Sequence, residues 1–250
     1  MIKNIFSYLE IHPLFYLIAF FAVFTASFFP FFIITFLIVV HEFGHLLMAY
    51  LCGGKVLKIL IYPLGGISKF STPFNISLTK EFIILIFGPI FQILACLFLV
   101  NIFPDERTLI STYHFGILFF NLLPIYPLDG GKFLCLFFHF FSSYKAAFYT
   151  TIFCGYFILF CFAYFYFISF SFNILFLIVF LFIKLSRELK RVPYYYEKFL
   201  LERYLNHYCF HKSKIVDSLD KFQREYRHLI KKGTIYYTEK EYLEKKYKNC

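Results

Sequence analysis

The pentapeptide His41-Glu42-Phe43-Gly44-His45 lies inside an apolar run that covers residues 13–52. Two histidines at i and i+4 share one face of a helix, where both rings can ligate one divalent metal ion. A glutamate between them is typical of the general base of zinc hydrolases. Because three ionisable side chains are costly at membrane depth, the pattern predicts a functional metal site within a transmembrane helix.

The composition indicates a membrane protein. Hydrophobic residues make up 60% of the 250 residues, and charged residues only 16%, against about 25% in soluble domains. The charges are also segregated, since residues 1–183 hold eight Lys and Arg whereas residues 184–250 hold seventeen. We therefore expect an all-α polytopic membrane protein followed by a small, basic C-terminal region.

Helix lengths divide the apolar part into spans. A helix needs about 20 residues to cross the hydrocarbon. The pattern predicts about six transmembrane helices, at 11–28, 31–52, 81–103, 108–128, 147–168 and 171–186. Phe28-Phe29-Pro30 separates the first two, and Pro124 and Pro127 interrupt the fourth. Residues 1–190 would form the membrane domain, and residues 191–250 a short cytosolic tail.

The lysines predict the orientation. The link between the second and third helices carries four of them without an intervening acid, and the tail opens with four basic residues in eight positions. The positive-inside rule then puts both termini in the cytoplasm. In this topology His45 and Asp129 both lie towards the cytoplasmic ends of their helices, at similar depth.

A catalytic zinc ion takes three protein ligands and keeps one position open. His41 and His45 would supply two, and the membrane segments offer His114, His139 and Asp129 for the third. Asp129 is preferred because it follows a proline-interrupted helix, which is tolerated at membrane depth only inside protein or along a cavity. The alternative for Asp129 is a helix cap. For His114 it is an interfacial or packing role, and His12 and His139 are expected at the membrane interface.

Four motifs carry a resemblance to a known family. They are His41-Glu42-Phe43-Gly44-His45, Pro63-Leu64-Gly65-Gly66, Gly88-Pro89, and the segment from Asn121 to Gly131 that contains Pro127-Leu128-Asp129-Gly130. Together they resemble the site-2 protease family of intramembrane zinc metalloproteases, over about residues 10–190. The resemblance implies one zinc ion held by His41, His45 and Asp129, with Glu42 activating the water.

The likeness is strongest for the members from endospore-forming bacteria. It implies a sigma-factor precursor as substrate, inhibitory membrane proteins as partners, and a place in the mother-cell membrane around the forespore. Asn121 would position the substrate or polarise its carbonyl, or else form an interhelical hydrogen bond. Gly65 and Gly66 would lie in a strand edge that holds the substrate by strand addition, or in a plain turn.

The tail departs from this family pattern. The sporulation members carry a cystathionine-beta-synthase-type (CBS) domain, for which residues 192–250 are short. We expect two amphipathic helices, at 216–226 and 239–247, with a short strand near Ile235 between them. The tail is then a degenerate CBS-like region, a basic surface for anionic lipids or an acidic partner, or simply a solvated tail.

These observations predict an intramembrane zinc endopeptidase that cleaves a membrane-associated protein near the cytoplasmic face. The lipid bilayer is its environment, and no direct contact with nucleic acid is expected. Two alternatives remain open at this point: a membrane transporter that binds metal through the same ligands, and a non-catalytic membrane scaffold.

Overall fold

The computed structural model describes residues 9–11, 13–62, 65–71, 73–169, 172–206, 208, 210 and 212–248. The chain divides into two compact units. The first consists of Met1–Thr72 and Phe82–Asn121, and the second of Pro73–Glu81 and Leu122–Cys250. Each unit is largely helical and also contains a three-stranded sheet, so the expectation of an all-α protein is wrong in that respect.

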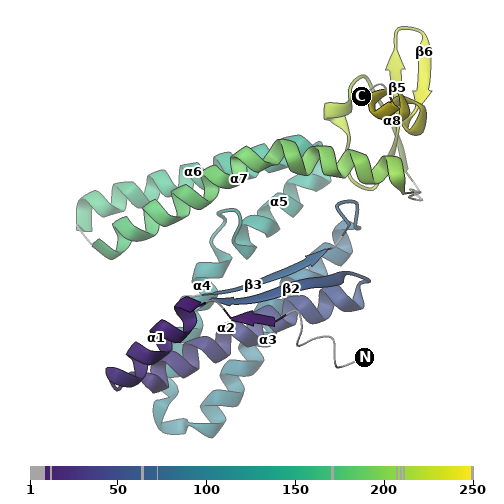
Figure 1. Ribbon diagram of the computed structural model, residues 1–250. Helices are drawn as coiled ribbons and strands as arrows, with labels where there is room; N and C mark the ends of the chain where they lie inside the picture. The colour runs from purple at the N-terminus through teal and green to yellow at the C-terminus, as the bar shows by residue number, and fades with distance from the viewer. Residues whose placement is uncertain are drawn as a thin grey trace. The chain divides into compact units, whose positions relative to one another are not determined.

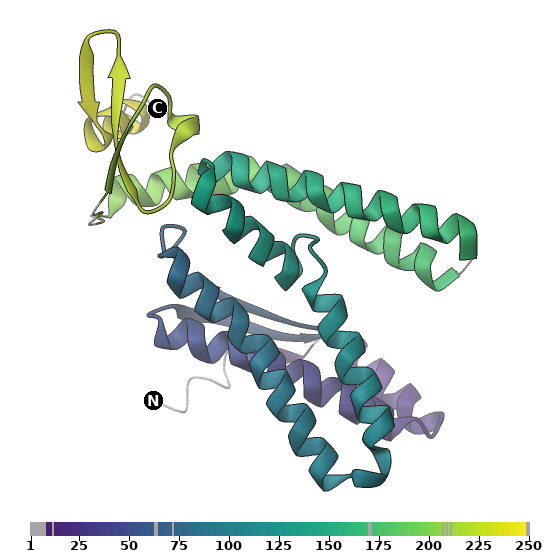
Figure 2. The same cartoon turned by 180° about the vertical axis from the view of Figure 1, so that it is seen from behind.

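Helices dominate the first unit. They are α1 (Pro13–Phe24), α2 (Phe28–Leu51), α3 (Leu78–Ile102) and α4 (Arg107–Leu122). A 3-10 turn, η3 (Pro104–Glu106), joins α3 to α4, and Figure 2 shows the two helices side by side. Ile33 and Leu37 of α2 meet Ala95 and Leu99 of α3 and Ile110 of α4 in a buried core. The expected helices at 31–52 and 81–103 are found as α2 and α3.

The first predicted helix, at 11–28, is shorter than expected. α1 ends at Phe24, and the chain turns before α2 begins at Phe28, with Ala26 at a φ of 55°. The turn signal at Pro30 instead falls within the first turn of α2. A proline there loses no hydrogen bond, because the first four N–H groups of a helix have no intrahelical partner.

A sheet completes the first unit. Its strands are β1 (Leu9–Ile11), β2 (Lys55–Tyr62) and β3 (Gly65–Ser71), in the order β1-β2-β3. β1 runs parallel to β2, β2 and β3 are antiparallel, and β3 packs along α2 (Figure 1). Gly65 and Gly66 are therefore strand residues, whereas Pro63 and Leu64 of the same motif lie outside the described residues.

The second unit begins its helical part with an element that the sequence did not predict. The helix expected at 108–128 ends at Leu122, and residues 123–128 are non-helical. A new helix, α5 (Asp129–Phe141), follows. Pro124 and Pro127 account for the break, since each lacks the N–H that helix propagation requires.

Two long helices follow and pack side by side: α6 (Tyr144–Ser169) and α7 (Phe172–Leu205) (Figure 1). The sixth predicted helix, at 171–186, is too short, because α7 continues to Leu205 with Pro193 in its interior. Three helices within the described residues are long and apolar enough to cross a membrane: Phe28–Leu51, Leu78–Ile102 and Tyr144–Tyr166. The count of six remains a prediction.

The C-terminal region is a small mixed fold. It comprises β4 (Lys212–Val216), the 3-10 turn η4 (Leu219–Lys221), β5 (Tyr226–Lys232), β6 (Ile235–Thr238) and α8 (Glu239–Lys248). β5 is the central strand, parallel to β4 and antiparallel to β6. The strand expected near Ile235 and the helix expected at 239–247 are confirmed as β6 and α8.

The helix expected at 216–226 is wrong. Its apolar residues Val216 and Phe222 are both buried, at 5% and 0% exposed. Six residues apart, they would point about 120° away from each other on an α-helix, at or beyond the edges of the roughly 100° apolar stripe that a helix typically buries. A strand that ends at Val216, followed by a tight turn, brings both side chains into the core.

Arg203 of α7 joins this C-terminal fold to the rest of the second unit. Its guanidinium is 1% exposed and donates to Asn75 Oδ1 at 2.7 Å, to the Gln223 carbonyl at 2.8 Å and to Glu239 Oε1 at 2.8 Å. Arg224 adds an ion pair with Glu81 at 2.5 Å. The segment Pro73–Glu81 and the C-terminal fold are therefore held together around two buried arginines.

Candidate metal centre

The two histidines of the pentapeptide lie one turn apart on α2, in the first unit. His41 is 2% exposed and His45 is 5% exposed. Their Nε2 atoms face each other at 3.1 Å. The i, i+4 spacing therefore produces the shared helix face that the sequence predicts.

The outer ring nitrogens of both histidines are engaged by α3. Nδ1 of His45 lies 2.8 Å from the carbonyl oxygen of Ile84, and Nδ1 of His41 lies 3.0 Å from Oε1 of Gln92. A carbonyl oxygen can only accept, so both Nδ1 atoms carry the proton. Both Nε2 atoms then present lone pairs.

This arrangement fits a metal ion. Two nitrogen lone pairs that face each other at 3.1 Å repel, and a cation between them turns that repulsion into coordination. Metal-ligating histidines commonly donate their other N–H to a carbonyl or carboxylate, which fixes the ring and its tautomer. Neutral imidazoles are ordinary ligands of Zn²⁺.

Close approach of α2 and α3 makes this geometry possible. A Cβ added to Gly88 would come 2.2 Å from Nε2 of His45, and one added to Gly44 would come 2.5 Å from the carbonyl oxygen of Phe87. Real Cβ atoms do not reach such distances, so each helix needs glycine where it faces the other. Glu42, between the histidines, is half-buried.

Asp129 belongs to the second unit, where it is the first residue of α5 and 6% exposed. Lys132 Nζ donates to its Oδ1 at 2.9 Å. A carboxylate in the first turn of a helix is also stabilised by the helix dipole. The Asp129 side chain is therefore held as a buried anion.

Gly130 and Gly131 allow the turn at 123–128 to pack against α5. A Cβ at Gly130 would come 2.1 Å from the carbonyl oxygen of Leu122, and one at Gly131 would come 2.3 Å from the amide nitrogen of Tyr126. The pair of glycines after Asp129 is therefore a packing requirement of this turn.

The other residues singled out in the sequence have varied surroundings. Asn121 lies in the last turn of α4 and is half-buried. Gly65 and Gly66 open β3, opposite Tyr62 and Ile61 of β2. These placements leave their roles in substrate binding as predictions.

His114 and His139 are both buried rather than exposed. His114, at 5% exposed, meets Gln92, and His139, at 4% exposed, contacts the carbonyl oxygen of Cys135 at 2.7 Å through Nδ1. A packing role therefore describes both better than an interfacial one. His12 lies outside the described residues.

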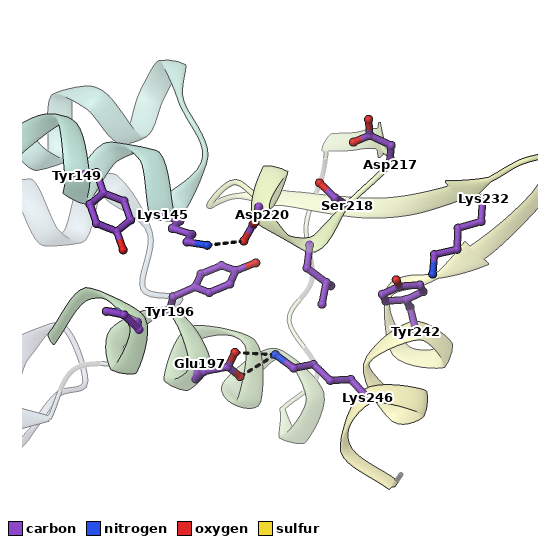
Figure 3. A pocket seen from close by; sticks show the side chains of 12 residues that line it. Lys145, Tyr149, Tyr196, Glu197, Asp217, Ser218, Asp220, Lys232, Tyr242 and Lys246 are labelled. Atoms are coloured by element: carbon purple, nitrogen blue, oxygen red, sulfur yellow. Dashed lines mark hydrogen bonds and ion pairs between the residues drawn. The ribbon is translucent and has the colours of Figure 1, made fainter. Parts of the chain in front are cut away.

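A hollow of about 610 Å³ lies elsewhere in the second unit (Figure 3). Lys145 donates to Asp220 at 3.0 Å on one wall, and Lys246 donates to both carboxylate oxygens of Glu197 at 2.7 Å on another. Its lining, as the structure describes it, contains no histidine or cysteine. It offers ion pairs and tyrosines rather than groups for metal chemistry.

Sequence reasoning missed Gln92. Its amide joins His41 to His114, yet the sequence shows only a single polar residue in the apolar stretch 82–100 of a long helix. That isolation was the available signal, because an amide in such a helix must find partners from its neighbours. The Ile84 carbonyl could not be predicted, since a backbone acceptor leaves no mark in the sequence.

Comparison with known proteins identifies the family of the chain. The model of peptidase family M50 matches residues 29–105. Stage IV sporulation protein FB of Bacillus subtilis is 30% identical over 206 residues, which are 78% of this chain and 71% of that protein. Zinc metalloprotease MJ0392 of Methanocaldococcus jannaschii is 33% identical over 104 residues, which are 39% of this chain and 30% of that protein.

A solved structure shares the fold. The site-2 protease from Methanocaldococcus jannaschii superposes with a TM-score of 0.54 at 22% sequence identity, over 72% of this chain and 89% of that chain. The apolar helices and these relatives make the protein an integral membrane protein. The chain therefore belongs to peptidase family M50, the site-2 family of membrane metalloproteases.

Proposed function

We propose that this metalloprotease is a zinc endopeptidase that hydrolyses a peptide bond of a membrane-associated protein near the cytoplasmic face. The observation that carries the proposal is the pair of buried Nε2 atoms of His41 and His45, 3.1 Å apart, with both outer nitrogens engaged. A zinc metalloprotease among the relatives supports the choice of metal.

Asp129 supplies the third ligand in this proposal, for a single zinc ion. All three side chains are buried. Two imidazoles and one carboxylate are a common ligand set for catalytic zinc and leave a position for water and substrate. Glu42 is then not one of the ligands and has the proposed role of proton transfer.

Bound zinc would polarise the scissile carbonyl and acidify the attacking water. The Glu42 carboxylate takes the proton from that water and delivers it to the leaving amine. Its half-buried position next to His41 supports this role. Asn121 would hold the substrate or share in polarising the carbonyl.

The edge of β3 is the proposed docking place for the substrate backbone. Among the described strands, β3 pairs only with β2 and leaves its other edge open. An extended segment could add there as a further strand, since main-chain hydrogen bonds hold it without regard to sequence. Gly65 and Gly66 would admit it closely.

The proposed topology has six crossings with both termini in the cytoplasm, supported by the lysines of the loops. The proposed substrate is the precursor of a sporulation sigma factor, supported by the likeness to stage IV sporulation protein FB. The protein would then reside in the mother-cell membrane around the forespore, under the control of inhibitory membrane partners. Its tail would be a shrunken CBS-like region in the cytosol.

The test is co-expression of the full chain with a candidate sigma-factor precursor. We expect wild type to shorten the precursor, and Glu42→Gln and Asp129→Asn to leave it intact. Glu42→Gln should retain zinc in the purified protein, whereas Asp129→Asn should lose most of it. Full cleavage by Glu42→Gln would refute the assigned base. If wild type cleaves another membrane-anchored substrate but no sigma-factor precursor, only the substrate assignment is wrong.

A further inference from the structure

Gln92 is a polar residue in the interior of the apolar helix α3. Its side chain is 0% exposed. Burying an amide without hydrogen bonds is strongly unfavourable. Its presence in the core of the first unit therefore calls for compensating partners.

Those partners fix the orientation of the amide. Nε2 donates to the carbonyl oxygen of His114 at 3.0 Å, and also approaches Nδ1 of His114 at 3.4 Å. The carbonyl can only accept, so the amide nitrogen must face it. Oε1 is thereby turned to His41 Nδ1, at 3.0 Å.

The consequence concerns the metal-facing atom of His41. An acceptor opposite Nδ1 keeps the ring proton on Nδ1, so that Nε2 is the ring nitrogen that carries the lone pair. With the amide reversed, its N–H would face Nδ1 and favour the other tautomer, with the proton on Nε2. The orientation of one amide thus decides which nitrogen of His41 can bind a metal ion.

We propose that Gln92 is a positioning residue that holds His41 in its metal-binding tautomer and is itself oriented by the His114 carbonyl. The inference rests on the proposed function, in which His41 binds zinc. His45 has the equivalent support from the main chain of Ile84, which no side-chain substitution removes. Gln92 is therefore the point at which this support can be tested.

The test compares two substitutions that separate hydrogen bonding from packing. Gln92→Met keeps the volume but removes the acceptor. Gln92→Glu keeps an acceptor for His41, and when protonated it can still donate to the His114 carbonyl. Zinc affinity is measured on the purified full chain in detergent by competition with a chromophoric chelator, and Co²⁺ absorption reports the ligand geometry.

We expect Gln92→Met to bind zinc about 10–100-fold more weakly, the usual effect of removing an outer-shell partner. Gln92→Glu should stay near wild type in affinity and in its Co²⁺ spectrum. His114→Leu retains the backbone carbonyl and should also stay near wild type. His41→Ala removes a proposed ligand and gives the zinc affinity expected when the site is lost.

If Gln92 serves only for packing, the order of the zinc affinities is reversed. Gln92→Met should then bind zinc like wild type, and Gln92→Glu, with its buried carboxyl group, should bind it more weakly. Wild-type zinc affinity in Gln92→Met, or equal weakness in both variants, would overturn the inference and leave the proposed function standing. A wild-type chain without measurable zinc affinity would overturn both. Should Gln92→Met fail to fold, weak binding by a folded Gln92→Glu would still refute the proposal.

Discussion

Gly88 of α3 lies directly against the imidazole of His45 of α2. A Cβ at position 88 would meet three ring atoms of that histidine, with Nε2 the nearest at 2.2 Å. The ring is thus confined between its own helix and the backbone of the next. The glycine of the Gly88-Pro89 motif is therefore a steric requirement for the position of the His45 ring.

Gly88→Ala should remove metal binding and with it cleavage. The new methyl group needs the space of the Nε2 atom that would ligate the ion, so the ring must rotate or the helices must separate. Zinc content of the purified variant measures the effect. Gly116→Ala in α4 is the matched control, because nothing lies within 4 Å of a Cβ there. Zinc retained at the wild-type level in Gly88→Ala would contradict the assigned geometry.

Gly44→Ala tests the same helix contact from the other side. The added Cβ would come 2.5 Å from the backbone oxygen of Phe87, which cannot move without α3. Overpacking of this kind costs about 1–3 kcal/mol of stability. It should also lengthen the contacts of His41 with Gln92 and of His45 with Ile84, so that zinc affinity falls. Thermal unfolding and chelator competition measure the two effects, and unchanged values in both would count against close helix packing as the determinant.

The helix that carries His41 and His45 could be predicted from the sequence because its evidence is local. The i, i+4 spacing of His41 and His45 and the apolar flanks determine both the helix and its shared face. The partners of those rings could not be predicted in the same way. Gln92 and the Ile84 carbonyl reach the histidines across 51 and 39 residues of chain, and only tertiary packing brings them together.

Helix ends were the weakest part of the prediction for a related reason. The prolines after Leu122 were read correctly as a break, but α5 beyond it depends on Gly130 and Gly131 packing against the turn. In the tail, Val216 and Phe222 are buried by strand pairing and a turn, which no local helical pattern reveals. At both places the structure is determined by packing against other parts of the chain and not by the local helical pattern.

Arg203→Met should loosen the C-terminal fold. Removal of the guanidinium takes away the donor to Oε1 of Glu239, whose side chain is 12% exposed, and the donor to the Gln223 carbonyl. Breaking a buried pair in this way costs about 3–5 kcal/mol. Hydrogen exchange in residues 212–248 of the full chain should speed up accordingly.

Lys221→Ala provides the comparison for Arg203→Met. Its ion pair with Asp217 is exposed on both sides, at 60% and 64%, so its loss should leave hydrogen exchange almost unchanged. Arg203→Lys should fall between the two, because one ammonium cannot reach all the acceptors of the planar guanidinium. Equal exchange in Arg203→Met and Lys221→Ala would exclude Arg203 as the anchor of this region.

His228 should make the same C-terminal fold sensitive to acid. The ring is 0% exposed, lies 4.3 Å from the Phe222 ring in a stacked arrangement, and accepts a hydrogen bond from the Gln223 N–H at 3.1 Å through Nε2. Burial lowers the pKa of His228 below its ordinary value of 6.5, and Arg203 lowers it further, although Glu239 opposes both. The folded state therefore favours the neutral ring.

The sign of the pH effect follows from this lowered pKa. Above pH 6.5 the ring is neutral in both states and the stabilisation is complete. As the pH falls from 6.5 towards the lower folded-state pKa, the unfolded chain binds more protons, and the free energy of unfolding decreases.

Hydrogen exchange in residues 212–248 of the full chain, corrected for its intrinsic pH dependence, should thus be faster at pH 5.5 than at pH 7.5. His228→Gln lacks the titrating ring and should show a smaller difference between the two pH values. The same difference in both proteins would assign the acid sensitivity to other groups.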